Sequence, residues 1–129
     1  MSTASGQLWV AVDLTLRRTD EGGRATAIAA TTELSYRPNW SIRTSDPRAQ
    51  SGAPVFVIDP PTVSPGARAR AVVVPLDPPH WAGVGPGSRL FLFEGPRDCG
   101  RAEVLDVWTT ETPITDEARR RARSWVAGD

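Results

Sequence analysis

Apolar and polar residues alternate along several short stretches of the chain, a two-residue period typical of β-strands with one buried face. The clearest stretch is residues 8–16. Its apolar side is formed by Leu8, Val10, Val12, Leu14 and Leu16. The opposite side carries Trp9, Ala11, Asp13 and Thr15. The sequence therefore predicts a half-buried strand over residues 8–16.

Two later stretches repeat this alternation near the end of the main fold. In residues 89–94, Leu90 and Leu92 are opposed to Phe91 and Phe93. In residues 101–108, one side carries Ala102, Val104 and Asp106, and the other carries Glu103, Leu105 and Val107. Both stretches are predicted to be strands.

Three further strands are expected at residues 40–44, 55–58 and 68–76. Pro75 cannot donate a backbone hydrogen bond, so the far end of the last of these should lie at a sheet edge or a bulge. Residues 25–34 are rich in Ala and Thr and fit either a weak helix or a strand, and the threonines and flanking turns favour the strand.

Glycine and proline separate these stretches. Gly22 and Gly23 can take the positive φ that a hairpin requires, residues 63–66 spell a tight turn, and residues 77–87 and 95–100 form further loops. Short strands with turns about every ten residues are typical of a sandwich or a closed barrel.

The C-terminus has a different pattern. Thr115 can cap a helix that has acidic residues in its first turn and arginines in its last turns, which suits the helix dipole. Its apolar stripe consists of Ala118, Ala122, Trp125 and Val126. Such a helix packs Trp125 onto the barrel or presents its arginines to a partner, and the stripe favours packing. We expect a flexible N-terminus over residues 1–7, one barrel over 8–109, and a linker and helix over 110–129.

Fifteen basic residues balance fifteen acidic ones, and every basic residue is arginine. A GC-rich genome explains the absence of lysine, and selection for bidentate phosphate binding is the alternative. Zero net charge argues against broad, sequence-independent affinity for nucleic acid, which depends on neutralising phosphates. Any such binding is expected to be local.

The composition also limits the chemistry. The single Cys99 excludes an internal disulfide, and one cysteine with one histidine cannot supply a zinc site, so we expect no metal and no cofactor. Residues 1–7 show no signal peptide, and no apolar run approaches the about 20 residues that span a bilayer. We expect a cytoplasmic protein with no membrane or nucleotide partner.

His80 is the best candidate for a general base, with Asp77 or Ser88 beside it. The chain has no second histidine, no Gly-x-Ser-x-Gly elbow and no paired-carboxylate pattern. Asp98 would oppose ionisation of the Cys99 thiol. We therefore expect no enzymatic activity, and a small enzyme using the His80 loop is the least favoured alternative.

Several motifs occur in an order that resembles one known family. Glu21-Gly-Gly-Arg24 precedes Tyr36-Arg-Pro38, and that element opens a segment that continues as Asn-Trp-Ser-Ile-Arg-Thr-Ser-Asp to Asp46. Val63-Ser-Pro-Gly66 then precedes a long strand, and Gly87-Ser-Arg-Leu90 leads to a hairpin containing Glu94-Gly95, Arg97 and Gly100. Over residues 8–108 this order is similar to the third, C-terminal domain of elongation factor Tu.

The resemblance implies an all-β fold, a closed antiparallel six-stranded Greek-key-like barrel of the translation-factor type, here with a short C-terminal helix. It also implies that partner or RNA contacts fall on Arg24, Tyr36, Arg37, Arg97 and Gly100. In the family, the arginine of Tyr-Arg-Pro and the last hairpin touch the T-stem of tRNA. Arg37 alternatively pairs with a carboxylate and fixes the turn before Pro38.

Some positions depart from the family. The chain has no P-loop and therefore no GTPase domain, the segment between Arg24 and Tyr36 is longer, and Phe93 and Pro96 replace an arginine and a glycine. We therefore expect a stand-alone, non-catalytic binding module that recognises a protein or RNA partner, with tRNA one possibility. The alternative is a structural or regulatory mimic that competes for elongation factor partners or self-associates.

Overall fold

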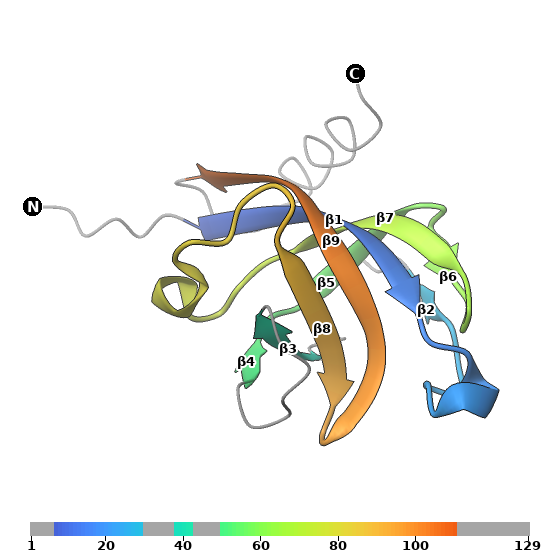
Figure 1. The fold of residues 1–129 in the computed structure, drawn as a ribbon. Coiled ribbons are helices and arrows are strands. Elements are labelled where there is room, and N and C mark those ends of the chain that lie inside the picture. The colour runs from blue at the N-terminus through green and yellow to red at the C-terminus, as the bar shows by residue number, and fades with distance from the viewer. Residues whose placement is uncertain (1–6, 30–37, 43–49, 111–129) are drawn as a thin grey trace, which may run out of the picture.

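The computed structural model describes residues 7–29, 38–42 and 50–110 of the chain, and the regular secondary structure in these ranges is almost entirely strand (Figure 1). Their strands, in chain order, are β1 Gln7–Leu16, β2 Ile28–Ala29, β3 Asn39–Ile42, β4 Gln50–Gly52, β5 Val55–Asp59, β6 Thr62–Val63, β7 Arg68–Val73, β8 Arg89–Glu94 and β9 Arg97–Thr110. Two short 3-10 helices, η1 Thr19–Glu21 and η2 Pro78–Trp81, lie in the connections. The prediction of an all-β protein is confirmed.

Seven of these strands form one antiparallel sheet in the order β4-β3-β8-β9-β1-β7-β5, and β2 pairs with β6 separately. The sheet curls around its inner face, with the long strands β1 and β9 side by side at its centre (Figure 1). Consecutive strands β8 and β9 form a hairpin, whereas β1 lies between β9 and β7. The described strands therefore make a half-barrel.

The prediction of a closed six-stranded barrel is wrong in its strand count and in its continuity. The described part of the main sheet has seven strands, and its order begins at β4 and ends at β5 without a ladder between them. These two strands are separated only by Ala53 and Pro54. Pro54 has no backbone N–H, and this interrupts a stretch that would otherwise run as one strand.

Three backbone hydrogen bonds flank the interruption at residues 52–54. They run from Ala53 N to Pro38 O (3.1 Å), from Val74 N to Pro54 O (2.9 Å) and from Leu76 N to Gly52 O (3.2 Å). The first ties this link to the residue before β3, and the other two tie it to the chain that follows β7. The link between β4 and β5 thus contacts both sides of the curled sheet.

The inner face of the sheet holds the main core. Its largest buried side chains include Trp40, Trp81, Leu14, Leu90 and Leu92. Both indoles have hydrogen-bond partners, because Trp40 Nε1 donates to Ala53 O and Trp81 Nε1 donates to Ser51 Oγ, each at 3.0 Å. Burying a tryptophan is favourable when its N–H is satisfied in this way.

A second, smaller cluster lies on the outer face, at the end where β1 begins and β9 ends. Trp9 stacks between Phe56 and Trp108, with ring centroids 6.4 and 6.1 Å away. Val72 and Val74 complete the cluster, and both are fully buried. One end of the outer face is therefore apolar.

The predicted faces of residues 8–16 and 89–94 are confirmed, since Val10, Val12 and Leu14 lie in the main core while Trp9 and Asp13 face outward. The predicted faces of residues 101–108 are wrong beyond Val104. A bulge lets Ala11 pair with Asp106 and Val12 with Val104, so Leu105 has no partner in β1. The extra residue reverses the alternation, and Val107 packs against the main core with Val104.

Turn chemistry is confirmed at Gly22 and Gly66, whereas Gly23 does not take the positive φ that was predicted for it together with Gly22. Gly22 ends η1 with φ 95° and Gly66 has φ 86°, conformations that favour glycine. The predicted strand over residues 68–76 ends at Val73, before Pro75. Of residues 25–34, only Ile28 and Ala29 are in a described strand.

The predicted C-terminal helix and residues 1–6 of the predicted flexible N-terminus, residues 1–7, lie outside the described residues, and Gln7 is the first residue of β1. Within the described ranges, no helix has the length and apolar character needed to cross a bilayer.

Candidate functional site

The outer face of the sheet carries a charged region next to the apolar cluster. Residues that pair across antiparallel strands point to the same face. One outward row consists of Phe91 on β8, Arg101 on β9, Thr15 on β1 and Arg68 on β7. The neighbouring outward row consists of Arg89, Glu103, Asp13 and Arg70. Four strands thus bring arginines from distant parts of the sequence together.

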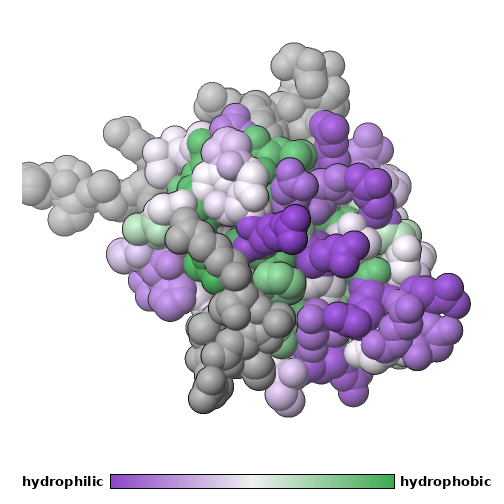
Figure 2. Space-filling model, viewed as in Figure 1, coloured by the Kyte–Doolittle hydropathy of each residue, from purple (hydrophilic) through white to green (hydrophobic). Residues whose placement is uncertain are grey.

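Two cavities of about 300 and 580 Å³ adjoin on these rows and share Thr15, Phe91 and Arg101. We call the combined depression the outer groove. Apart from the three shared residues, its lining side chains with charge are Arg17, Arg18, Glu21, Asp98, Asp13, Arg68, Arg89 and Glu103. Hydrophilic side chains gather over this side of the molecule (Figure 2). The groove is polar and open to solvent.

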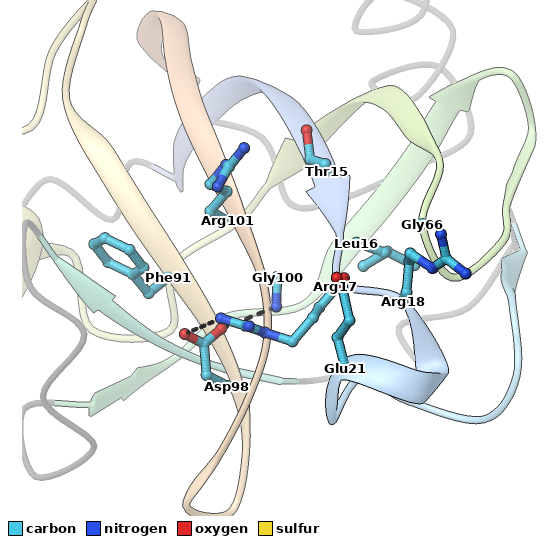
Figure 3. A pocket seen from close by; sticks show the side chains of 10 residues that line it. All are labelled: Thr15, Leu16, Arg17, Arg18, Glu21, Gly66, Phe91, Asp98, Gly100 and Arg101. Atoms are coloured by element: carbon cyan, nitrogen blue, oxygen red, sulfur yellow. Dashed lines mark hydrogen bonds and ion pairs between the residues drawn. The ribbon is translucent and has the colours of Figure 1, made fainter.

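Ion pairs neutralise several of these arginines. Arg17 Nη2 donates to Asp98 Oδ2 at 3.1 Å, and Asp98 Oδ1 accepts from the Gly100 amide at 3.2 Å (Figure 3). Arg68 donates to Asp13 across the groove, and this hydrogen bond together with the charge of Asp13 raises the pKa of the Arg68 guanidinium. These pairs hold the two ends of the groove.

Arg101 lies between these pairs on β9 and differs from them. Its side chain is exposed and points away from the Arg17–Asp98 pair, toward the side of Thr15 (Figure 3). Among residues 7–29, 38–42 and 50–110 the guanidinium of Arg101 has no hydrogen-bond or ion-pair partner, and the same holds for the guanidinium of Arg89. The groove therefore contains guanidinium groups that can bind an anion without breaking an ion pair.

Phe91 supplies the apolar part of the groove. It pairs with Arg101 across β8 and β9 and is half-buried, whereas the next outward residue of β8, Phe93, is buried. A partly exposed ring beside a guanidinium can hold both the apolar and the charged part of a ligand. The groove can therefore bind a ligand that has both a negative charge and an apolar part.

Of the residues assigned by resemblance, Arg24 already has partners. Its Nη1 donates to Glu94 Oε2 at 2.8 Å, and its Nε donates to Thr26 O at 2.8 Å. The guanidinium is mostly buried, with 15 % of the side chain exposed. Arg24 therefore joins the loop after η1 to the end of β8.

Arg97 is exposed and pairs in register with Glu94 at the tip of the β8–β9 hairpin. The structure thus brings Arg24 and Arg97 to Glu94, outside the lining of the outer groove. Tyr36 and Arg37 lie outside the described residues.

Gly100 lines the groove through its backbone. A Cβ at this position would lie 2.7 Å from Thr15 O and 3.3 Å from Leu16 Cα. Glycine is needed here because β9 passes this close to β1. Gly100 therefore allows β9 to pack closely against β1, and its backbone forms part of the groove floor.

His80 and Cys99 both lie outside the lining of the outer groove. His80 is exposed in η2, Ser88 Oγ accepts from the Gly85 amide, and neither described cavity includes the histidine. Burial raises the pKa of the Cys99 thiol, with the charge of Glu94 adding to it. Within the described ranges, no group of His, Cys, Asp and Glu side chains could hold a metal ion.

The residues at the centre of the groove, Phe91, Arg101 and Thr15, were missed by the sequence analysis. A signal was present, since Asp13, Thr15, Arg89, Phe91 and Arg101 all occupy outward positions of alternating strands. That signal becomes a site only once the strand order and register are known.

No protein-family model matches the chain, and no curated protein matches it in sequence.

Proposed function

We propose that this protein is a non-catalytic binding module that recognises a protein or RNA partner through the outer groove. The observation that carries the proposal is Arg101, an exposed guanidinium without a partner among the described residues, in a depression where Arg17 and Arg68 are neutralised. Arginine and aromatic residues commonly anchor interfaces. Arg101 and Phe91 are such a pair.

We also propose that this half-barrel resembles the third domain of elongation factor Tu, which is a barrel of the translation-factor type. The hydrogen bonds at residues 52–54 support it, because they connect the link between β4 and β5 to both sides of the sheet. Because a fold does not by itself determine an activity, the proposed binding function rests on the outer groove.

Two routes of contact are compatible with this function. The first is the outer groove, and the second is the β8–β9 hairpin that carries Arg97. The groove is favoured because it offers a concave surface with two arginines that have no ion-pair partner in the described part, whereas Arg97 lies at a hairpin tip opposite Glu94. An RNA partner draws support from Arg101 beside Phe91, since a guanidinium and a ring can hold a phosphate and a base.

The test is quantitative affinity capture from a translation-competent cell extract, with and without nuclease. Wild-type protein is compared with Arg101→Glu and with Arg97→Glu, and each variant is first checked for an unchanged thermal unfolding midpoint. We expect Arg101→Glu to lose the captured partner and Arg97→Glu to retain it.

If Arg97→Glu alone loses the partner, contact runs through the hairpin. If both variants retain every captured component, the outer groove has no binding role. Loss of the partner after nuclease treatment identifies it as RNA. A shift of tRNA mobility at low salt that weakens with Arg37→Ala or Arg101→Ala identifies tRNA.

A further inference from the structure

We propose that the outer groove binds an extended acidic peptide, with one carboxylate held by Arg101 and an adjacent apolar side chain on Phe91. This inference rests on the proposed binding function and names the chemistry of the partner. It follows from the length of the groove, the arrangement of charges in it and the position of Phe91.

The groove has the length of a short extended segment. Along β9 its lining runs from Asp98 to Glu103. At about 3.3 Å per residue this distance is roughly 17 Å, which fits about five residues of extended chain. A peptide of that length can reach from the Arg17–Asp98 pair to Arg89.

The charges favour a ligand with one or two negative groups. Arg101 stands near the middle of the groove and Arg89 lies toward one end, and neither has an ion-pair partner among the described residues. A planar guanidinium donates two parallel hydrogen bonds to a carboxylate. A ligand with one carboxylate at Arg101 and a second near Arg89 would pair with both guanidinium groups.

The same charges disfavour a nucleic acid strand. The lining also carries Asp13, Glu21, Asp98 and Glu103. A phosphate backbone places a negative charge at every step, so it would meet these carboxylates as well as the arginines. A peptide can place neutral or basic residues opposite them.

Phe91 adds an apolar contact next to the charged one. Its ring is half-buried and directly opposite Arg101 in the β8–β9 ladder. A leucine or phenylalanine beside the peptide carboxylate can cover this ring and reduce the exposure of the ion pair to water, which strengthens it. The preferred ligand therefore combines a glutamate or aspartate with a large apolar neighbour.

The test is a calorimetric and NMR titration of the full chain with capped peptides of about five residues, a length set by the strand rise. One peptide carries a central glutamate with leucine and phenylalanine two positions before and after it, so that all three side chains face the groove, and the matched control carries glutamine instead of glutamate. A single-stranded RNA of similar length is the third probe. Backbone amides of Phe91, Arg101 and Gly100 report the site.

We expect the glutamate peptide to bind about ten- to a hundred-fold more tightly than the glutamine peptide, the range of a charge-assisted hydrogen bond. The largest amide shifts should lie at Phe91 and Arg101. Arg101→Lys keeps the charge but loses the planar fork and should weaken binding about tenfold. Arg97→Lys changes an exposed arginine at the tip of the β8–β9 hairpin that does not line the groove, and it should leave the affinity unchanged.

Equal affinity for the glutamate and glutamine peptides, or amide shifts confined to residues outside the groove, would overturn the proposal. Arg101-dependent binding of the RNA alone would overturn the peptide assignment but leave the binding function intact. Binding of neither probe, together with partner capture that survives Arg101→Glu, would overturn both.

Discussion

Arg24 Nη1 lies 2.8 Å from Glu94 Oε2, and this ion pair joins the loop after η1 to the last residue of β8. The pair is partly buried, with 15 % and 34 % of the two side chains exposed. An arginine that the family resemblance assigns to a partner thus stabilises the β8–β9 hairpin.

A double-mutant cycle tests this role. Arg24→Ala and Glu94→Ala should each lower the free energy of unfolding, with a coupling of about 1 kcal/mol for a partly exposed pair. The matched control is the Arg18–Asp20 pair, whose side chains are 66 % and 68 % exposed. Its coupling in urea unfolding should be close to zero, and equal couplings for the two pairs would contradict this account.

Gly100 offers a second test. Gly100→Ala places a methyl group 2.7 Å from Thr15 O, so we expect a loss of about 1–3 kcal/mol from overpacking between β9 and β1. Gly85→Ala is the control, because no atom lies within 4 Å of a Cβ there. Chemical denaturation should show a change within about 0.5 kcal/mol for Gly85→Ala. A tolerated Gly100→Ala would show that the strands are further apart than described.

Because of Cys99, we expect the free energy of unfolding to fall at alkaline pH. Burial, with a smaller contribution from Glu94, raises the pKa of its thiol, so the folded protein holds the proton more tightly than the unfolded chain. The stabilisation that this difference in pKa provides is fully present at pH values below the ordinary thiol pKa. It is lost as the pH rises through the pKa of the thiol in the folded protein. Urea unfolding from neutral to alkaline pH should show the decline, and Cys99→Ala should reduce it. An identical decline in the variant would rule out Cys99 as its cause.

The η2 loop should contribute to stability through Trp81, and its His80 should have no catalytic role. Trp81 is buried in the core and its indole donates to Ser51, so Trp81→Ala should cost about 3–5 kcal/mol, whereas His80→Ala should cost less than about 0.5 kcal/mol. Thermal and urea unfolding measure both. Partner capture should be unchanged by His80→Ala. If that substitution removed an activity while the protein stayed folded, the non-catalytic interpretation would be wrong.

The strands were predictable where the alternation is regular. Residues 8–16 and 89–94 keep a two-residue period throughout, and the structure uses the predicted faces of Leu14 and Leu90. Residues 101–108 have the same period in sequence, but a bulge reverses the faces after Val104. The bulge depends on how β9 pairs with β1, and no residue in β9 predicts it.

The candidate site was less predictable because it depends on strand order. Arg101 is one exposed arginine among many in the sequence, and its importance comes from lying between Phe91 and Thr15. Conversely, Arg24 is distinctive in sequence but pairs with Glu94, which lies 70 residues away. Charge pairing between strands therefore decides which arginines remain available to a ligand.

Site-specific photo-cross-linking tests the central claim most directly. The photoreactive residue p-benzoylphenylalanine replaces Phe91 inside the outer groove or, as the control, the exposed Pro86 in the loop before β8. We predict a discrete adduct in living cells from position 91 that disappears with Arg101→Glu, and none from position 86. Equal adducts from both positions, or an adduct from position 91 that survives Arg101→Glu, would contradict the assignment of the outer groove as the partner site.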